Sequence, residues 1–450
     1  MNKKNTNNTK LKTVYFLSLG CPKNRVDTDV MAASLIDKGM KLVFEPEIAD
    51  VIVVNTCSFI GDAKEESIDA LLEMAEYKKN GTCKKLVAAG CLPQRYGKEL
   101  GESITEIDLL TGTSSPDRLP ELINETFKDT SMLKGSHFLQ KDNTPRLITK
   151  GQKSVYVKIS DGCSRKCAFC AIPGIRGKSE SRSIENIKNE ITLLAQSGAV
   201  EINLVSQDTA QYGKDLKDGT TLEKLLKELN TIDKIKWIRI LYLYPDSISD
   251  SLLKTIDKID KVVPYLDIPI QHAADNMLKA MRRGHTKKDI SNTLKRVRSF
   301  VKNPFLRTTV MVGFPGETEN DAGELVSFIT ESSFNNLGAF RYSDEEGTPA
   351  VNMKPKVSKK ESYNRWRKVM AAQKKVARAE NRKLIGTVLP VLIEDTADES
   401  GYILIGRHLG QAPDIDGITY VTGSNAKIGD IINCKITDFK DYDLVAEEVS

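Results

Sequence analysis

The sequence predicts an α/β protein in three parts: an N-terminal parallel α/β sheet domain, a central partial (β/α)6 barrel and a small C-terminal antiparallel β-barrel. Short apolar runs alternate with helix-like segments through most of the chain, which is typical of parallel sheets with buried strands. A polar stretch separates these runs into two series. After Gly386 the pattern changes to short runs of alternating polarity, which indicates a small barrel.

The composition is that of a soluble globular protein. The chain has 450 residues, of which 40% are hydrophobic and 28% charged, so it can bury a sizeable core. No run approaches the roughly 18 apolar residues of a membrane helix. Residues 1–13 are basic and rich in Asn without an apolar segment, so we expect a disordered lead-in and not a signal peptide. We therefore expect a cytoplasmic protein whose eight cysteines are reduced thiols or metal ligands.

The N-terminal domain is expected at residues 12–125. We expect strands at 14–19, 51–55 and 86–89, with helices at 30–38 and 63–78. Each apolar run is short and bounded by turn residues, as buried parallel strands are. A polar, irregular stretch runs from 117 to 150, and we expect a linker at 126–150.

The central domain is expected at residues 151–380 and the terminal barrel at 384–450. We expect central strands at 155–160, 200–206, 237–244, 264–270, 307–312 and 337–342, with helices such as 183–197 and 222–229. Six such units predict a partial barrel with its chemistry at the carboxyl ends of the strands. Residues 358–383 predict one long basic helix, and the runs VLPVLIE, YILIGR, ITYVTG, IINCKI and DLVAEEV predict the five strands of the terminal barrel.

The strongest chemical signal is the loop DGCSRKCAFC. It places Cys163, Cys167 and Cys170 after the first central strand with the spacing C-x3-C-x2-C. Three thiolates in one loop can hold a cubane iron–sulfur cluster and leave one iron open to another ligand. Zinc is the competing interpretation, but structural zinc sites have four ligands and favour paired C-x2-C spacings. Three incidental cysteines this close together would be an oxidation liability.

A second set of cysteines follows the N-terminal strands. Cys21, Cys57 and Cys91 each come just after a predicted strand, separated by 36 and 34 residues, about one β/α unit each. Because the carboxyl ends of parallel strands meet at one sheet edge, we expect these thiols to lie together. The alternative is three unrelated buried cysteines. Cys83 precedes its strand and Cys434 lies inside one, so both are expected to be structural.

The loop cysteines resemble the signature of the radical S-adenosylmethionine (SAM) superfamily, and the six β/α units resemble its partial barrel. The resemblance implies that SAM chelates the open iron of a 4Fe-4S cluster, and that one electron cleaves it to a 5′-deoxyadenosyl radical. With the N-terminal cysteines and the terminal barrel, nearly the whole chain resembles the methylthiotransferase family, whose C-terminal unit is a TRAM domain. This resemblance implies that Cys21, Cys57 and Cys91 hold a second 4Fe-4S cluster with an open iron for an exogenous sulfur. The clusters would carry the chemistry, so no acid–base side chain is expected as a catalyst.

Four motifs resemble the RimO branch of this family, which modifies an aspartate of ribosomal protein S twelve. They are SLGCPKN at 18–24, SQDTAQYG at 206–213, YLYP at 242–245 and APDIDG at 412–417. Arg25 and Thr28 stand where Leu and Ser are expected, outside the ligands. The resemblance implies transfer of a methylthio group to the aspartate β-carbon, and an electron donor such as a flavodoxin. The alternatives are a tRNA methylthiotransferase of the N6-isopentenyladenosine type and, in another class, a zinc-bearing RNA-binding protein.

The charge distribution favours a basic protein over tRNA as the substrate. Residues 384–450 hold 4 Lys/Arg against 12 Asp/Glu, a net charge of −8, whereas residues 358–383 hold 10 against 2, a net of +8. An acidic unit repels RNA and attracts a basic ribosomal protein, although surplus acid can also be an ordinary solvated surface. The basic helix could contact RNA or pair with the acidic barrel.

Six further residues are candidates for binding SAM. Phe169 lies within the cysteine loop, and Ser206 and Gln207 end the second central strand, where they could meet the SAM amino group. Gly313, in MVGFPGE, could admit the adenine or ribose closely. Arg176 and Arg182 follow the cysteine loop and could contact the SAM carboxylate or be surface charges.

Overall fold

The computed structural model describes residues 11–123, 138–149, 151–397 and 403–449. The predicted lead-in therefore lies mostly outside the described residues. The chain forms two compact units: unit 1 comprises Met1–Ile148 and Ala171–Lys178, and unit 2 comprises Thr149–Cys170 and Ser179–Ser450. No helix in the described part of the chain is both long and apolar enough to span a membrane.

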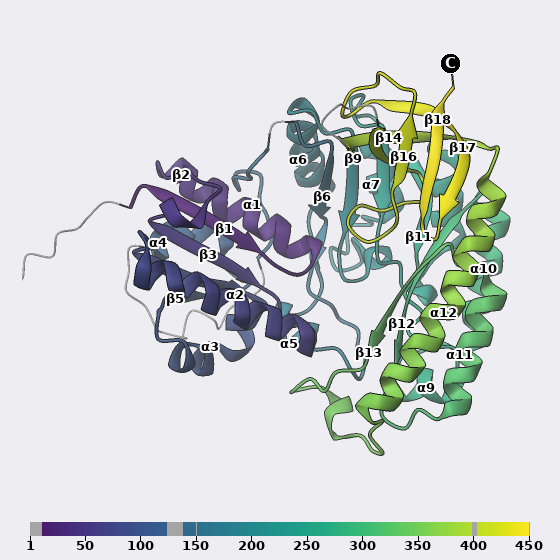
Figure 1. The fold of residues 1–450 in the computed structure, drawn as a ribbon, viewed down its shortest axis with the longest axis horizontal. Helices are drawn as coiled ribbons and strands as arrows, with labels where there is room; N and C mark the ends of the chain where they lie inside the picture. The colour runs from purple at the N-terminus through teal and green to yellow at the C-terminus, as the bar shows by residue number, and fades with distance from the viewer. Residues whose placement is uncertain (1–10, 124–137, 150, 398–402, 450) are drawn as a thin grey trace, which may run out of the picture. The chain divides into compact units, whose positions relative to one another are not determined.

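Unit 1 contains a five-stranded, fully parallel sheet with the strand order β2-β1-β3-β4-β5. Its elements are β1 (Thr13–Ser18), α1 (Pro22–Asp37), β2 (Lys41–Leu42), η1 (Pro46–Ile48), β3 (Val51–Thr56), α2 (Gly61–Asn80), β4 (Lys85–Gly90), α3 (Cys91–Ser103), β5 (Ile107–Thr111), η2 (Pro116–Arg118), α4 (Leu119–Leu122) and α5 (Ile172–Arg176). Figure 1 shows this sheet in purple and blue, with helices on both of its faces.

Alternate residues of the buried strands supply two separate cores. Ile52 and Val54 of β3 pack with α2 and α3 on one face, while Val51 and Val53 pack with α1 and α4 on the other. All six residues of β3 are buried, which agrees with its continuous apolar run. The predicted N-terminal α/β sheet is therefore confirmed, as a three-layer arrangement.

Three details of unit 1 differ from the prediction. Helix α1 begins at Pro22 and not at residue 30, because polar residues of its first turns, Asn24 among them, are buried against other polar groups and hide the apolar pattern. The short strand β2 and the edge strand β5 were not predicted. The stretch predicted as irregular from residue 117 begins with helical turns whose Leu119 and Leu122 are buried in the core.

The predicted linker at 126–150 is only partly described. Residues 124–137 and 150 lie outside the described ranges. In the remainder, the Leu147 N–H donates to the Asp29 carbonyl over 2.9 Å, and Arg146 forms an ion pair with the Asp29 carboxylate. The described end of this segment therefore packs on unit 1, which the polar composition did not indicate.

Unit 2 contains a six-stranded parallel sheet with the order β13-β12-β11-β10-β9-β6, so the predicted partial barrel is confirmed. Its elements are β6 (Ser154–Lys158), β7 (Ser160–Asp161), β8 (Glu180–Ser181), α6 (Ile184–Gln196), β9 (Glu201–Val205), η4 (Thr209–Gln211), α7 (Leu222–Leu229), β10 (Trp237–Ile240), η5 (Pro245–Ser247), α8 (Asp250–Lys258), β11 (Val262–Asp267), α9 (Asp275–Ala280), α10 (Lys287–Phe300), β12 (Phe305–Val312), α11 (Glu319–Ser332), β13 (Asn336–Arg341) and η6 (Pro349–Asn352). The antiparallel pair β7–β8 was not predicted.

The basic segment forms the long helix α12 (Lys359–Leu384), as predicted. Ser358 caps its first turn, because its side chain accepts a hydrogen bond from the Glu361 N–H while the Glu361 carboxylate bonds back to the Ser358 backbone. In Figure 1 this helix runs beside α11 and along β12 and β13. Lys374 and Arg378 of α12 form ion pairs with Asp441 of the terminal barrel. Of the two roles considered for the basic helix, these contacts favour pairing with the acidic barrel.

The last segment closes into a five-stranded barrel, shown in yellow in Figure 1. Its strands are β14 (Val388–Thr396), β15 (Ile403–His408), β16 (Thr419–Thr422), β17 (Ile431–Lys440) and β18 (Asp443–Glu448). Four of the strand pairs are antiparallel, as predicted, but β16 and β18 run parallel. The apolar pattern specifies which residues of a strand face the core but not the direction of its neighbour, so this pairing could not be predicted.

The loop between β15 and β16 carries the APDIDG motif and contacts two strands of the central sheet, β6 and β11. The Tyr265 hydroxyl donates to Asp416 Oδ2 over 2.7 Å, and the Tyr156 hydroxyl donates to the Pro413 carbonyl over 3.1 Å. Arg407, at the end of β15, forms a buried ion pair with Glu201, the first residue of β9. The motif therefore joins the barrel to the central sheet.

Candidate functional site

Cys21, Cys57 and Cys91, here called the N-terminal triad, follow three adjacent strands of the unit 1 sheet. Cys21 comes after β1 and caps α1, Cys57 follows β3 directly, and Cys91 is the first residue of α3, directly after β4. Strand β3 lies between β1 and β4 in the sheet. The structure thus places the three thiols at the carboxyl ends of adjacent strands, where Cys21 and Cys57 both help to raise the pKa of Cys91.

Two glycines bring the strand ends of this triad together. Gly20 has a φ of +85°, and a Cβ on it would lie 2.6 Å from Cys57 Cβ and 3.0 Å from Cys57 Sγ. Gly90 has a φ of +91°, and a Cβ there would lie 2.2 Å from Asn55 Oδ1. Both positions require a left-handed backbone and no side chain. The repeated Gly-Cys pair is a sequence signal that could have predicted this close approach.

Burial and the surrounding charges have opposite effects on the thiol pKa values of the N-terminal triad. Burial raises the pKa of Cys91 to about 12, while the guanidinium of Arg176 opposes this increase. Burial also raises the pKa of Cys57, and the nearby Cys21 adds to the effect. Cys21 and Cys91 lie at helix N-termini, whose dipoles favour thiolates. Metal ligation requires the thiols to be deprotonated, so a bound cation would favour their thiolate form.

Cys163, Cys167 and Cys170, here called the loop triad, lie after β7 in unit 2 and are half-buried. The backbone of the loop is fixed at Ala168, whose N–H donates to the Met281 carbonyl over 3.0 Å and whose carbonyl accepts from the Ala350 N–H over 2.9 Å. Phe169 is buried in the apolar cluster around this loop, where Cys167 and Cys170 also pack. Burial raises the pKa of Cys163, and the nearby Cys167 adds to the increase.

An arginine that the sequence analysis did not identify contacts this loop. Arg283 is buried, and its Nη1 donates to Cys167 Sγ over 3.4 Å. Its guanidinium lies 3.9 Å from the ring centroid of Tyr244, and that of Arg165 lies 3.8 Å from the same centroid. Tyr244 belongs to the YLYP motif, so this motif supports the cysteine loop. Arg283 follows β11 by sixteen residues, and no local pattern marks it.

Both triads have the donor set of a three-cysteine iron–sulfur site. Among the described residues, no three His, Cys, Asp or Glu side chains are close enough together to hold a single metal ion. The cysteines of a cubane bind different iron atoms and so lie farther apart than the ligands of one ion. The N-terminal triad fits such a cluster by its thiols, its strand ends, two helix N-termini and Arg176. The loop triad fits by its thiols, their spacing and Arg283.

The structure places Ser206 and Gln207 at the carboxyl end of β9. Gln207 Nε2 donates to Asp161 Oδ1 over 3.0 Å, while Gln207 Oε1 is buried with no hydrogen-bond partner among the described residues. The Ser206 hydroxyl accepts from the Asp208 N–H over 3.0 Å. A buried acceptor without a partner costs free energy, so Gln207 Oε1 fits a donor from a bound molecule.

Gly313 and Arg182, two of the candidates for binding SAM, both make close contacts within the protein itself. A Cβ on Gly313 would lie 2.3 Å from Ser362 Oγ, so helix α12 explains the glycine without a ligand. Arg182 is buried, and its Nη1 bonds to Glu190 Oε2 over 2.6 Å and to the Lys158 carbonyl over 2.7 Å. The structure therefore corrects the alternative of a surface charge at Arg182, and these contacts favour a structural role.

Arg176 was the other arginine candidate for the SAM carboxylate or a surface charge. It belongs to unit 1, where it is buried and forms an ion pair with Asp27 over 2.9 Å. Its Nη2 lies 3.9 Å from Cys91 Sγ, so it adjoins the N-terminal triad. It is therefore not a surface charge. Its partner Asp27 is 149 residues away in sequence, so spacing could not predict this pairing.

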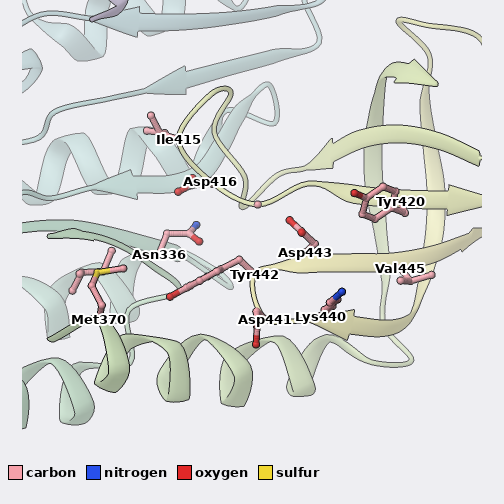
Figure 2. A pocket seen from close by; sticks show the side chains of 12 residues that line it. Asn336, Met370, Ile415, Asp416, Tyr420, Lys440, Asp441, Tyr442, Asp443 and Val445 are labelled. Carbon is pink, nitrogen blue, oxygen red and sulfur yellow. The ribbon is translucent and has the colours of Figure 1, made fainter. Parts of the chain in front are cut away.

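A separate cavity of about 830 Å³ lies between the terminal barrel, β13 and α12. Figure 2 shows Tyr442 extending from the barrel toward Met370, with Asp441 and Asp443 on either side of it in the chain. Asp441 forms ion pairs with Lys374 and Arg378 of α12, and Asp443 Oδ1 accepts a hydrogen bond from the Ile418 N–H over 3.0 Å. These carboxylates already have partners in the protein, so we assign no ligand to this cavity.

Three family models match the chain in the order of its parts. Residues 13–112 match the uncharacterized protein family UPF0004, residues 157–329 match the Radical SAM superfamily, and residues 385–449 match the TRAM domain. The solved structure of the radical SAM methyltransferase TsrM from Kitasatospora setae superposes with a TM-score of 0.55 at 14% identity, covering 76% of this chain and 77% of that one. The radical SAM enzyme OxsB superposes with a TM-score of 0.51 at 12% identity, covering 82% and 56%. The fold, the loop triad and the matched family define a radical SAM protein, a class that uses an iron–sulfur cluster and SAM.

The relatives at high identity specify the family. The ribosomal protein uS12 methylthiotransferase RimO of Myxococcus xanthus is 45% identical over 438 residues, covering 97% of this chain and 92% of the relative. RimO of Geobacter sulfurreducens is 44% identical over 440 residues, covering 97% and 98%. The chain belongs to this family, the RimO methylthiotransferases, and is an enzyme that transfers a methylthio group.

Proposed function

We propose that this enzyme replaces a hydrogen on the β-carbon of an aspartate in ribosomal protein uS12 with a methylthio group. The observation that carries the proposal is the similarity to RimO proteins over 97% of the chain, which includes all three parts of the fold. The four motifs SLGCPKN, SQDTAQYG, YLYP and APDIDG all lie within this similarity.

We assign one 4Fe-4S cluster to each cysteine triad. The loop triad would hold the cluster that binds SAM, and the N-terminal triad would hold a second cluster with an open iron for an exogenous sulfur. When bound, these groups supply one-electron cleavage of SAM and a sulfur for methylation and transfer. A C–H group at an aspartate β-carbon is too weakly acidic for any side-chain base to deprotonate at neutral pH, which is why the reaction requires a radical route and the groups that supply it.

The protein's own residues hold and orient these groups. In the loop triad, Ala168 fixes the backbone and Arg283 donates to Cys167 Sγ. Gln207 Oε1 is the acceptor that we assign to the SAM amino group, with Ser206 beside it. Phe169 belongs to the apolar wall of this site. In the N-terminal triad, Gly20 and Gly90 allow the cysteine-bearing strand ends to approach.

The surface charge of the terminal barrel supports a basic protein substrate. The described part of residues 384–449 exposes six carboxylates but only three ammonium groups. The carboxylates belong to Asp395, Asp414, Asp430, Asp438, Glu447 and Glu448, and the ammonium groups to Lys427, Lys435 and Lys440. Such a surface attracts a basic ribosomal protein and repels phosphates. We therefore expect no tRNA substrate. We also propose a cytoplasmic location and an electron donor such as a flavodoxin.

The test is the intact mass of uS12 from strains with and without this gene. We expect uS12 to be heavier with the gene by one methylthio group in place of one hydrogen, and a gene encoding Cys163→Ala to leave the mass unshifted. An unshifted uS12 in both strains, with a methylthioadenosine lost from tRNA in the deletion strain, would assign the enzyme to tRNA instead. A purified protein that bound zinc but neither iron nor SAM would contradict the enzyme proposal altogether.

A further inference from the structure

The side chain of Asn24 contacts the segments that carry the three cysteines of the N-terminal triad. Its side chain is fully buried at the start of α1. Its Nδ2 donates to the Leu19 carbonyl over 3.0 Å and to the Thr56 carbonyl over 2.9 Å, and each carbonyl lies within two residues of a triad cysteine. Its Oδ1 lies 3.8 Å from Cys91 Sγ. One amide group thus joins the ends of three neighbouring strands.

The same amide is bound by a buried arginine. Arg176 Nη2 donates to Asn24 Oδ1 over 2.8 Å and to Asp27 Oδ2 over 2.9 Å, and it lies 3.9 Å from Cys91 Sγ. Arg176 ends α5, in a segment of unit 1 that follows Cys170 directly in the chain. Its side chain is 1% exposed, so its positive charge is directed inside the protein.

This arrangement places a hydrogen-bond donor where negative charge would gather. Three thiolates and a bound sulfur bring more negative charge than a cubane core neutralises, and a buried site cannot rely on water to screen it. The ion pair with Asp27 offsets the desolvation free energy of burying the Arg176 guanidinium. Arg176 Nη2, which donates to Asn24 Oδ1, also lies 3.9 Å from Cys91 Sγ, so its positive charge adjoins the sulfur. Groups that surround metal ligands in this way set their orientation and tune the metal.

We propose that Asn24 and Arg176 are a positioning pair for the N-terminal triad. Asn24 fixes the spacing of the three thiols, and Arg176 donates to Cys91 Sγ and offsets the negative charge of the site. Both residues act through the cysteines. The burial of Asn24 also means that this part of the SLGCPKN motif serves the cluster site and does not contact a substrate. The inference rests on the proposed function, since it requires the triad to hold a cluster.

The experiment uses the full-length chain with Cys163, Cys167 and Cys170 all replaced by Ala, so that only the N-terminal triad can bind a cluster. This parent is reconstituted without oxygen from iron and sulfide, alone and with Arg176→Gln, Arg176→Lys or Asn24→Asp. Lys178→Gln is the matched control, because Lys178 lies in the same segment but is exposed. The readouts are iron per chain, the rate of iron release to a chelator, and the midpoint potential by electron paramagnetic resonance.

For Arg176→Gln we expect about 10- to 100-fold faster iron release and a more negative midpoint potential, because the reduced cluster loses a donor to its sulfur. Asn24→Asp loses both donors to the strand ends, and we expect it to bind less iron per chain. Lys178→Gln should match the parent in every readout. Arg176→Lys keeps the charge but loses the planar fork, so we expect faster iron release with a smaller shift of the potential.

Two results would contradict different parts of this inference, and the experiment distinguishes them. A folded Arg176→Gln protein with the iron-release rate and potential of the parent would overturn the positioning pair. A folded parent that binds no cluster would instead overturn the assignment of a cluster to the N-terminal triad, and so part of the proposed function. If Arg176→Gln does not fold, Arg176→Lys decides, and release as slow as in the parent would overturn the pair.

Discussion

The guanidinium of Arg283 donates a hydrogen bond to the sulfur of Cys167 over 3.4 Å. The same side chain bonds to the Pro269 carbonyl and lies against the ring of Tyr244, whose hydroxyl donates back to the Arg283 carbonyl over 2.6 Å. These contacts hold the arginine in one orientation toward the loop triad. A donor to a cluster sulfur stabilises the reduced state, because reduction adds negative charge.

We therefore expect Arg283→Gln to make the potential of the loop-triad cluster more negative and to slow SAM cleavage by about 10- to 100-fold. The potential is measured by electron paramagnetic resonance in a protein whose N-terminal triad is replaced by alanine. The control is Arg282→Gln, because Arg282 is the adjacent arginine and is exposed. Equal potentials in the two variants would contradict a role for the Arg283 hydrogen bond.

Gly20→Ala should disturb the N-terminal triad and leave the loop triad intact. The new Cβ would lie 2.6 Å from Cys57 Cβ, at a backbone φ of +85°. We expect a loss of about 1–3 kcal/mol in the free energy of unfolding from the steric conflict and iron content reduced to that of the loop cluster. Gly39→Ala is the control, because Gly39 has a similar φ of +89° but nothing within 4 Å. Iron loss in both variants would indicate that backbone strain, and not the contact with Cys57, is responsible.

The two triads should separate the two parts of the reaction. Cys21→Ala is expected to keep SAM cleavage, because the loop triad is unchanged, but to lose methylthiolation of uS12. Cys167→Ala is expected to lose both. Product analysis for 5′-deoxyadenosine and mass analysis of uS12 measure the two activities. Retention of both activities by Cys21→Ala would show that Cys21 is not required at the site.

Glu201 should make stability depend on acid pH. Burial raises its pKa, but Arg407 and Arg239 outweigh this and lower it from its ordinary value of 4.5 to about 2. A carboxylate with a lowered pKa in the folded state contributes stability above its unfolded pKa and loses it as the pH falls. The contribution of Glu201 is thus complete above about pH 5 and declines from there toward pH 2.

Glu201→Gln removes the carboxylate that the two buried guanidinium groups of Arg239 and Arg407 share, so we expect a loss of about 3–5 kcal/mol in unfolding free energy at pH 7. Urea unfolding at a series of pH values should show this difference from the wild type shrinking as the pH falls below about 5. Glu394→Gln is the control, because Glu394 pairs with Arg407 but is partly exposed, and its effect should be smaller. A difference that stayed constant with pH would contradict the lowered pKa.

The sequence predicted the parts of the site that depend on local pattern. Cys21, Cys57 and Cys91 each follow an apolar run, and parallel strands place their carboxyl ends at one edge whatever their detailed packing. The spacing of the loop triad likewise predicted an iron–sulfur site, since all three cysteines lie within eight residues. The positions of these cysteines could be predicted because secondary structure and short loops are determined by neighbouring residues, whereas their roles as cluster ligands stay predictions.

Only the tertiary structure decided which side chains surround those cysteines. Arg176 was a candidate for SAM binding because it follows Cys170, and the structure adds a hydrogen bond to Asn24, which is 152 residues away in sequence. Arg283 contacts Cys167, which is 116 residues away, from a segment with no motif. Hydrogen bonds and ion pairs between distant segments depend on how sheets and helices pack, and a buried polar side chain leaves no periodic signal of its partner. The sequence alone thus indicated which cysteines form the two triads, whereas packing decided which arginines and which amide lie beside them.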